Sequence, residues 1–228
     1  MNDYARAVNA MRARIAAAER RYDRPPGSVN MLAVSKTRTA GDIRAVLGAG
    51  QRLFGESYLQ EAAAKMDALA DQPIEWHFIG PVQSNKTRGI AERFSWVHGV
   101  DRLKIAQRLS AQRPEHLPAL NICIEVNIGG EPSKSGAPPA EVPALAHELS
   151  RLPRLRLRGL MAIPPVCRDF ETQRGHFRRA RELHDDLIQA SFDLDTLSMG
   201  MTDDLEAAIA EGTTIVRIGS GIFGHRTR

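Results

Sequence analysis

The sequence predicts a (β/α)8 barrel, also called a TIM barrel, built as one domain over residues 1–228 with an extra amino-terminal helix. Short apolar strands alternate with amphipathic helices eight times, which is the count that closes such a barrel. The length of 228 residues also fits, because α/β barrels of about 200–250 residues are routinely single domains. A hydrophobic fraction of 43% and a charged fraction of 25% are ordinary for a globular protein with a sizeable core.

The extra helix is predicted over residues 3–22, where apolar residues recur at helical spacing, and Pro25-Pro26-Gly27 ends it. The apolar run 31–37 follows as the first strand. Thr39 and Asp42 then have the spacing of a capping box, in front of a short helix that ends at Gly48 or Gly50. This is the first strand and helix pair of the barrel.

The rest of the chain repeats this alternation. An open doubly wound sheet is the alternative, but no strand is missing from the eight that a closed barrel needs. Further strands are predicted at 52–56, 75–80, 95–98, 122–128, 155–163, 196–199 and 214–219, with helices at 57–70, 84–92, from Asp101 onward, and at 140–151, 169–190 and 203–211.

The positive charge of the chain, +4 in net terms, is spread along it rather than gathered in a basic block. The densest stretch places Arg174, Arg178 and Arg181 on one side of a predicted helix, opposite an apolar stripe. We interpret this side as a solvated helix face. No nucleic-acid recognition motif accompanies it, so a nucleic-acid partner is not expected.

The two cysteines, Cys123 and Cys167, form no CxxC pair, and the seven histidines lack metal-site spacings such as HExxH. No metal site is therefore expected, and a reducing compartment suits the free thiols. The amino terminus has no apolar signal core, and no apolar stretch is long enough to span a bilayer. We expect a cytoplasmic protein without a membrane partner.

Lys36 stands at the end of the first apolar strand, and it is the only lysine that terminates such a strand. Catalytic and ligand-binding groups of a parallel barrel collect at the carboxyl ends of its strands. An amine that apolar walls partly shield loses its proton more readily and can attack an aldehyde. Lys36 is therefore a candidate Schiff-base lysine, and a solvated lysine closing a strand is the alternative.

The loops after strands seven and eight have the composition of a phosphate site, which barrels usually build there with a short extra helix. The first loop, 198–202, offers the Ser198 hydroxyl and Gly200 before a helix whose first amides are unpaired donors. The second, 219–224, offers Ser220 and glycines that let the backbone come close to an anion. We expect a phosphate group between these loops.

Two other glycine patterns are false matches. Residues 219–224 fit GxGxxG, but a dinucleotide fold needs a further helix, strand and acidic residue, and this sequence ends at Arg228. Residues 130–135 resemble a phosphate loop but lack the glycine before the lysine. Neither NAD nor ATP is expected.

Arg217 lies two residues before Gly219, so both occupy the same face of the last strand. A pyridoxal phosphate held by its phosphate would present its ring nitrogen to Arg217. A guanidinium does not surrender its proton, so the nitrogen stays unprotonated and the ring is a weak electron sink. The alternative is a buried arginine paired with a strand carboxylate, Glu125 or Glu56.

Nine motifs, in order from about residue 30 onward, resemble those of the pyridoxal phosphate homeostasis proteins. They are Leu32-Ala-Val-Ser-Lys-Thr37, Phe54-Gly-Glu-Ser-Tyr58, Trp76-His-Phe-Ile-Gly80, Gln83-Ser-Asn-Lys86, Ser133-Lys-Ser-Gly136, Gly159-Leu-Met161, Leu197-Ser-Met-Gly-Met-Thr-Asp-Asp204, Val216-Arg-Ile-Gly-Ser220 and Ile222-Phe-Gly224. Members of that family are single-domain barrels similar to the amino-terminal domain of alanine racemase.

The resemblance implies that Lys36 binds pyridoxal 5'-phosphate covalently and that Arg217 faces the ring nitrogen. It also implies that the phosphate is held by Ser198, Gly219 and Ser220, in the loops that include Gly200, and that His77 and Met161 line the pocket. Lys134 matches a family lysine proposed as a second handling site; the alternative is an exposed loop lysine. Ser57 departs from the family, which usually has asparagine there. The shorter serine leaves room for a water or lowers the affinity.

The implied function is a carrier that buffers or delivers pyridoxal phosphate to dependent apoenzymes and maintains its cellular level without robust catalysis, as a monomer. An amino-acid racemase is the alternative, but it needs a second proton carrier on the other face of the substrate. Alanine racemases take a tyrosine from a second domain, and only Tyr58 follows a strand end near this site. A cofactor-free sugar-phosphate enzyme is a third hypothesis, which leaves Lys36 and Arg217 without roles.

Overall fold

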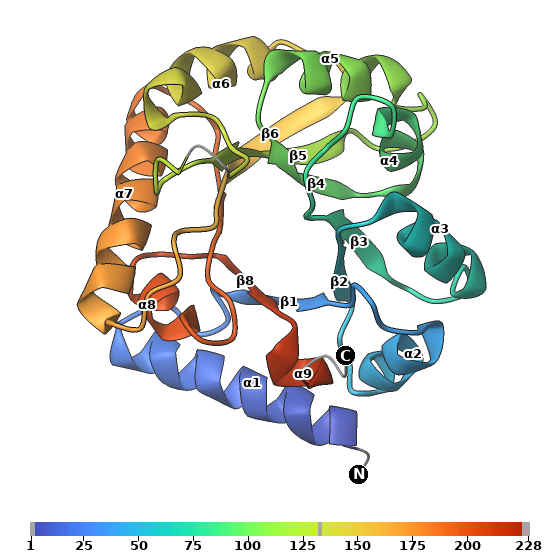
Figure 1. Ribbon diagram of the computed structural model, residues 1–228, viewed down its shortest axis with the longest axis vertical. Helices are drawn as coiled ribbons and strands as arrows, with labels where there is room; N and C mark the ends of the chain where they lie inside the picture. Colours follow the sequence, from blue (N-terminus) through green and yellow to red (C-terminus); the bar gives the residue numbers. More distant parts are fainter. Residues whose placement is uncertain (1–2, 132–133, 225–228) are drawn as a thin grey trace.

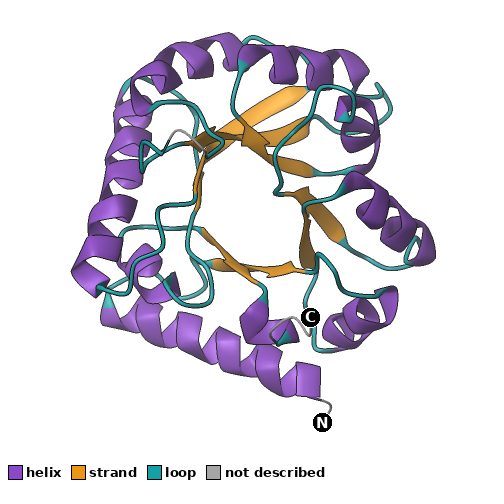
Figure 2. Ribbon diagram, viewed as in Figure 1, coloured by secondary structure: helices purple, strands orange, loops and turns teal. Residues whose placement is uncertain are grey.

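The structure, a computed structural model of the 228-residue chain, describes residues 3–131 and 134–224. Eight parallel strands follow one another in sequence order around a closed barrel, and helices surround it (Figures 1 and 2). The ring closes because the first strand pairs with the last, from Asn30 beside Ile215 to Ala33 beside Ile218. The predicted (β/α)8 barrel is therefore confirmed, and the open sheet is excluded.

The eight strands are three to eight residues long. They are β1 (Asn30–Val34), β2 (Leu53–Glu56), β3 (Glu75–Phe78), β4 (Trp96–Val100), β5 (Leu120–Val126), β6 (Leu155–Ala162), β7 (Thr196–Ser198) and β8 (Ile215–Ile218). The helices are α1 (Asp3–Arg21), α2 (Ala40–Gly48), α3 (Leu59–Ala68), α4 (Thr87–Arg93), α5 (Leu103–Gln112), α6 (Val142–Ser150), α7 (Phe170–Gln189), α8 (Leu205–Ala210) and α9 (Ser220–Phe223), with a 3-10 turn η1 (Pro139–Glu141) before α6.

The predicted elements occur where the sequence places them, with bounds that differ by a few residues. The Thr39 hydroxyl accepts from the Asp42 amide at 3.1 Å and the Asp42 carboxylate accepts from the Thr39 amide at 2.8 Å, so the capping box is confirmed. The main difference lies at the first strand, which ends at Val34 rather than Thr37. Arg38 folds back to the Ser35 carbonyl and Thr37 has a φ of 67°. Lys36 therefore lies in a loop just past the strand.

The extra helix α1 runs along the outside of the barrel against α2, α8 and α9 (Figure 1). Its buried residues are Val8, Met11, Ile15, Ala18 and Glu19. The Glu19 carboxylate accepts from the Val29 amide at 2.9 Å. The helix thereby anchors the start of β1 and covers the segment that follows β8. These two strands border the candidate site.

The arginines of α7 are not simply solvated, which corrects the interpretation from the sequence. The Glu211 carboxylate is buried just after α8, and three arginines converge on it. Arg174 approaches it at 2.8 Å, Arg178 at 3.1 Å and Arg181 at 3.2 Å. The sequence spacing does place the three on one side of α7, but that side fastens α7 to the end of α8.

Within residues 3–131 and 134–224, no helix is at once long and apolar enough to cross a membrane. The same residues contain no group of three or more histidine, cysteine, aspartate or glutamate side chains with metal-site geometry.

Candidate functional site

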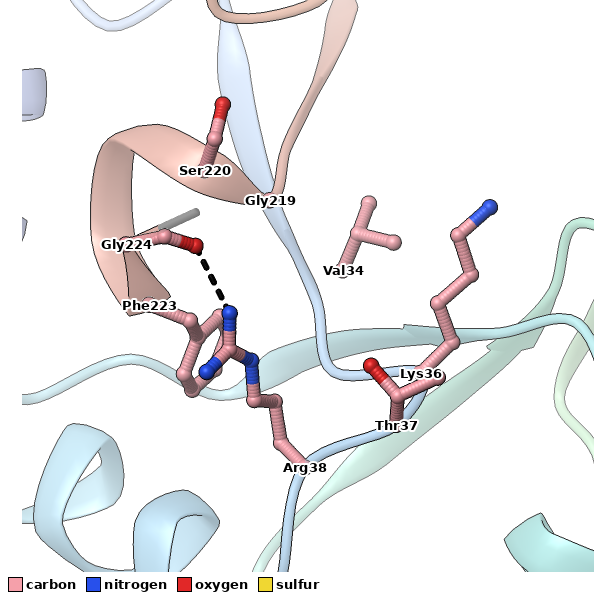
Figure 3. Close-up of a pocket in the computed structure, with 8 residues that line it drawn as sticks. All are labelled: Val34, Lys36, Thr37, Arg38, Gly219, Ser220, Phe223 and Gly224. Carbon is pink, nitrogen blue, oxygen red and sulfur yellow. Dashed lines mark hydrogen bonds between the residues drawn. The ribbon is translucent and has the colours of Figure 1, made fainter. Parts of the chain in front are cut away.

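Two adjoining cavities open at the carboxyl end of the barrel, with volumes of about 440 and 250 Å³. Val34, Lys36, Gly219 and Ser220 line both of them. Figure 3 shows the Lys36 and Ser220 side chains rising on either side of Val34. The structure therefore brings together the strand-end lysine and the glycine loop after β8.

The loop that carries Lys36 is tied down on both sides of it. Lys65, from α3, donates to the Ser35 carbonyl at 2.7 Å, and the Thr37 amide donates to Glu61 at 2.5 Å. Arg38 donates to the Gly224 carbonyl at 2.6 Å, which joins this loop to the end of α9 (Figure 3). Half-buried Lys36 is thus presented from a braced turn rather than from a free loop.

A buried ionic cluster supplies this bracing. The Lys65 ammonium contacts Glu56 at 2.8 Å and Glu61 at 2.5 Å, and the Ser35 hydroxyl donates to Glu56 at 2.6 Å. Burial raises the pKa of Glu56, although the hydrogen bonds from Lys65 and Ser35 oppose the rise. Because Lys65 and Glu56 are both buried, removing either one would leave the other without its counter-charge.

The polar end of the site is formed by the loops after β7 and β8. The Ser220 hydroxyl lies 3.2 Å from the Thr202 hydroxyl, and the Gly221 amide donates to the same Thr202 oxygen at 3.2 Å. Both hydroxyl side chains line the smaller cavity. Thr202 belongs to the motif 197–204, but the sequence alone does not single it out as a cofactor-binding residue. Its position four residues past a three-residue strand is the signal that places it in the loop.

Ser198 and Gly200 line neither cavity. Ser198 is the last residue of β7 and is fully buried. Gly200 has a φ of 90°, and a Cβ at this position would lie 2.5 Å from the Cβ of Ala208, so only glycine fits. Its carbonyl accepts from the Arg217 amide at 2.9 Å. Ser198 and Gly200 therefore pack beneath the loop after β7, and Thr202 of the same loop lines the smaller cavity.

Arg217 forms the inner wall of the smaller cavity and is almost completely buried. Its Nη1 donates to the Ser198 carbonyl at 2.6 Å and to the Ser198 hydroxyl at 2.9 Å, and its Nη2 donates to the Ala162 carbonyl at 2.9 Å. Burial lowers the pKa of Arg217 to about 10, while the charges of Asp204 and Glu125 oppose this change. The guanidinium therefore remains protonated near neutral pH.

The alternative reading of Arg217, a close ion pair with Glu125 or Glu56, is not what the structure shows. Glu56 instead faces Lys65 on the outer side of the barrel. Glu125 points into the barrel, and burial, with the nearby charge of Asp101, raises its pKa to about 7. Glu125 is thus a buried carboxyl that changes charge near neutrality, and it lines neither cavity.

The remaining predicted residues lie at different depths. Ser57 lines the smaller cavity, and Gly80 packs so closely that a Cβ there would lie 2.5 Å from the Ser57 carbonyl oxygen. His77 and Met161 are buried inside the barrel and line neither cavity. His77 stacks on Trp96 with ring centroids 5.3 Å apart. These two residues lie beneath the site rather than in its wall.

Lys134 lies in the loop between β5 and η1, half-buried. Its ammonium contacts Glu131 at 2.6 Å and donates to the Pro164 carbonyl at 3.5 Å. It lines neither cavity. Ser133, in the same motif, lies outside the described residues.

Comparisons with known proteins agree with this geometry. The family model of the alanine racemase amino-terminal domain matches residues 7–227. A pyridoxal phosphate homeostasis protein of Pseudomonas aeruginosa is 57% identical over 226 residues, which cover 99% of this chain and 97% of the relative.

Solved structures show the same barrel. PipY of Synechococcus elongatus, solved with pyridoxal phosphate bound, has a TM-score of 0.86 and 37% identity, covering 97% of this chain and all of that one. Alanine racemase of Clostridium difficile, at 14% identity and a TM-score of 0.68, shares the fold, and the match covers 95% of this chain and 57% of the racemase. The chain therefore belongs to the pyridoxal phosphate homeostasis protein family, as its motifs indicate.

Proposed function

We propose that this protein binds pyridoxal 5'-phosphate at the carboxyl end of its barrel and holds it reversibly, so that it buffers or delivers the cofactor. One observation carries the proposal. A single cavity is lined by Lys36, Thr202, Ser220 and Arg217. The names of the relatives and the cofactor-bound PipY structure support it.

The donor groups fit the three functional parts of the cofactor. The hydroxyls of Thr202 and Ser220 lie together with the Gly221 amide and suit the phosphate. Hydrogen bonds to a charged phosphate are stronger than those between neutral groups. The Lys36 amine attaches to the aldehyde carbon with loss of one water. Arg217, which only donates, suits the ring nitrogen. When bound, the cofactor supplies a reactive aldehyde and a conjugated ring that absorbs visible light.

The same geometry favours a carrier over a catalyst. Arg217 stays protonated near neutral pH, because its pKa of about 10 lies well above neutrality. The ring nitrogen then receives a hydrogen bond without a proton, and the ring withdraws electrons weakly. Tyr58, the tyrosine nearest the site in sequence, is 56% exposed. A racemase needs a positioned proton carrier on the second face of the substrate. Such general acid–base catalysis contributes a factor of about 10²–10⁴ in rate.

Several finer expectations belong to this proposal. We infer that residues 1–228 act as one cofactor-binding domain, as a monomer in the cytoplasm, and that dependent apoenzymes receive the cofactor. Lys134 is a second handling position on this view, since it lies on a loop that also contacts Pro164, just after β6.

The proposal is tested by titrating the purified protein with pyridoxal phosphate and recording its absorption spectrum. We expect a visible-range band that Lys36→Ala abolishes and that Lys104→Ala, an exposed lysine on α5, leaves unchanged. No band with the wild-type protein would favour a cofactor-free sugar-phosphate enzyme. A separate incubation with L-alanine in deuterated water follows α-proton exchange by NMR. Exchange at enzyme-like turnover, lost in Lys36→Ala, would make the protein a racemase.

A further inference from the structure

A chain of hydrogen bonds runs through the barrel from the candidate site to its opposite end. The Arg217 guanidinium lies 2.9 Å from the Ser198 hydroxyl, which lies 2.9 Å from Nδ1 of His98. His98 Nε2 lies 2.9 Å from His77 Nδ1, and His77 Nε2 lies 2.9 Å from the Glu75 carboxylate. Four strands supply these five residues: β8, β7, β4 and β3.

The two ends of the chain face different surroundings. Arg217 lines the cavity at the carboxyl ends of the strands. Glu75 begins β3, its side chain is 46% exposed, and it lines a separate cavity of about 310 Å³ with residues from the starts of β4 and β5. The open centre of the strand ring in Figure 2 is where the inward-facing side chains of such a barrel lie. The chain therefore connects the site to the far end of the barrel.

The chemistry of the two ends gives the chain a single direction. Arg217 only donates, and an ionised Glu75 only accepts. His77 must then carry its proton on Nε2, which leaves Nδ1 to accept from His98 Nε2. His98 Nδ1 in turn accepts from the Ser198 hydroxyl, whose oxygen accepts from Arg217. With both histidines neutral, this is the one arrangement that satisfies every contact.

The charges around the chain support these protonation states. Burial lowers the pKa of His77, while Glu75 opposes the change. Burial, together with the charges of His77 and Arg217, holds the pKa of His98 well below its usual range. The hydrogen bond from His77 lowers the pKa of Glu75, with smaller help from Trp96 and Arg158. Three further groups act on Arg217 itself: Asp204, Glu125 and Cys123.

We propose that Glu75, His77 and His98 are positioning residues for Arg217, which they hold through Ser198 as a fixed donor facing the bound ring. The Arg217 contacts with Ser198 and Ala162 use three of the five guanidinium N–H groups, and Arg217 also lines the cavity. Aligned hydrogen bonds polarise one another, so the negative end at Glu75 strengthens the hold on Arg217. This inference deepens the proposed function and rests on it for its cofactor readout.

The first test needs no cofactor. Nitrogen-15 NMR of the histidine side chains in the wild-type protein is expected to show both rings neutral near pH 7, each with its proton on Nε2. In Glu75→Gln the amide can either accept or donate, so we expect the His77 resonances to show a mixture of both tautomers. A wild-type His77 protonated on Nδ1 would overturn the chain, and an unchanged His77 tautomer in Glu75→Gln would overturn the role of Glu75 in orienting it.

The second test reads the site through the bound cofactor. Glu75→Gln and Ser198→Ala, which break the chain at its far and near ends, are expected to shift the visible band and weaken binding by about threefold to tenfold. Glu92→Gln is the matched control, because Glu92 lines the same far cavity outside the chain. Tautomer changes without any spectral or affinity change would refute the positioning role. A wild-type protein that binds no cofactor would instead refute the proposed function.

Should Glu75→Gln fold poorly, Glu75→Asp gives the same information. Its carboxylate keeps the charge but is one methylene shorter, so partial recovery of the single His77 tautomer is expected. A His77 ring in Glu75→Asp that carries its proton on Nδ1, or equally on both nitrogens, would show that the carboxylate charge does not orient the chain.

Discussion

The Lys65 ammonium donates to the Ser35 carbonyl at 2.7 Å, one residue before the lysine that faces the cavity. Lys65 is 6% exposed and also contacts Glu56 and Glu61. A second lysine thus holds the first in place without reaching the cavity itself. The geometry of the site depends on an ionic cluster outside the barrel wall.

Lys65→Met is expected to lower the free energy of unfolding by about 3 kcal/mol, because it leaves Glu56 buried without its partner. Pyridoxal phosphate affinity should fall as well, since Ser35 loses its anchor. Chemical denaturation and a spectral titration measure the two effects. The double variant Lys65→Met with Glu56→Gln should recover at least half of the lost stability, and Lys104→Met should change neither quantity. Full affinity in a destabilised Lys65→Met protein would contradict the bracing role.

Substitutions in the polar loops test Thr202 and Ser220 as the hydroxyls that meet the phosphate. Thr202→Val keeps the shape of the side chain and removes its hydroxyl, so we expect roughly tenfold weaker cofactor binding. Ser220→Glu should weaken binding further, because it adds a like charge beside the phosphate. Fluorescence titration measures both. Unchanged affinity in both variants would mean that the phosphate lies elsewhere.

Glu125 gives a prediction for the cofactor-free protein. Its pKa is about 7 in the folded state against an ordinary 4.5, so the folded state holds this proton more tightly than the unfolded chain. The free energy of unfolding should therefore fall by about 3 kcal/mol from this group as pH rises from about 4.5 to 7. In Glu125→Gln that contribution disappears, and denaturation at pH 5 and pH 8 compares the two proteins. An identical pH dependence in wild type and variant would refute the prediction, and Glu92→Gln serves as the exposed control.

Local sequence patterns were sufficient to predict the fold. The eight alternations appear as eight strands, and the Thr39 capping box needs only residues three apart. The same patterns place Lys36, Gly219 and Ser220 at strand ends that close together, because β1 neighbours β8 in any closed barrel.

The sequence is less informative where function depends on strand register or on exact strand ends. The choice between Ser198 and Thr202 depends on β7 ending after three residues. The contact between His77 and His98, which are 21 positions apart in sequence, depends on β3 pairing His77 with Trp96. Lys65 sits on a helix face behind the loop it braces, and helical periodicity alone assigns it to the buried side without naming its partners.

The most direct test of the central claim is to locate the covalent attachment of the cofactor. The protein is incubated with pyridoxal phosphate, reduced with borohydride, digested and analysed by mass spectrometry. We expect the pyridoxyl group on the peptide that contains Lys36, and no label there in Lys36→Ala. A label confined to Lys134, Lys65 or another lysine in the wild-type protein would contradict the assignment of Lys36 as the attachment point.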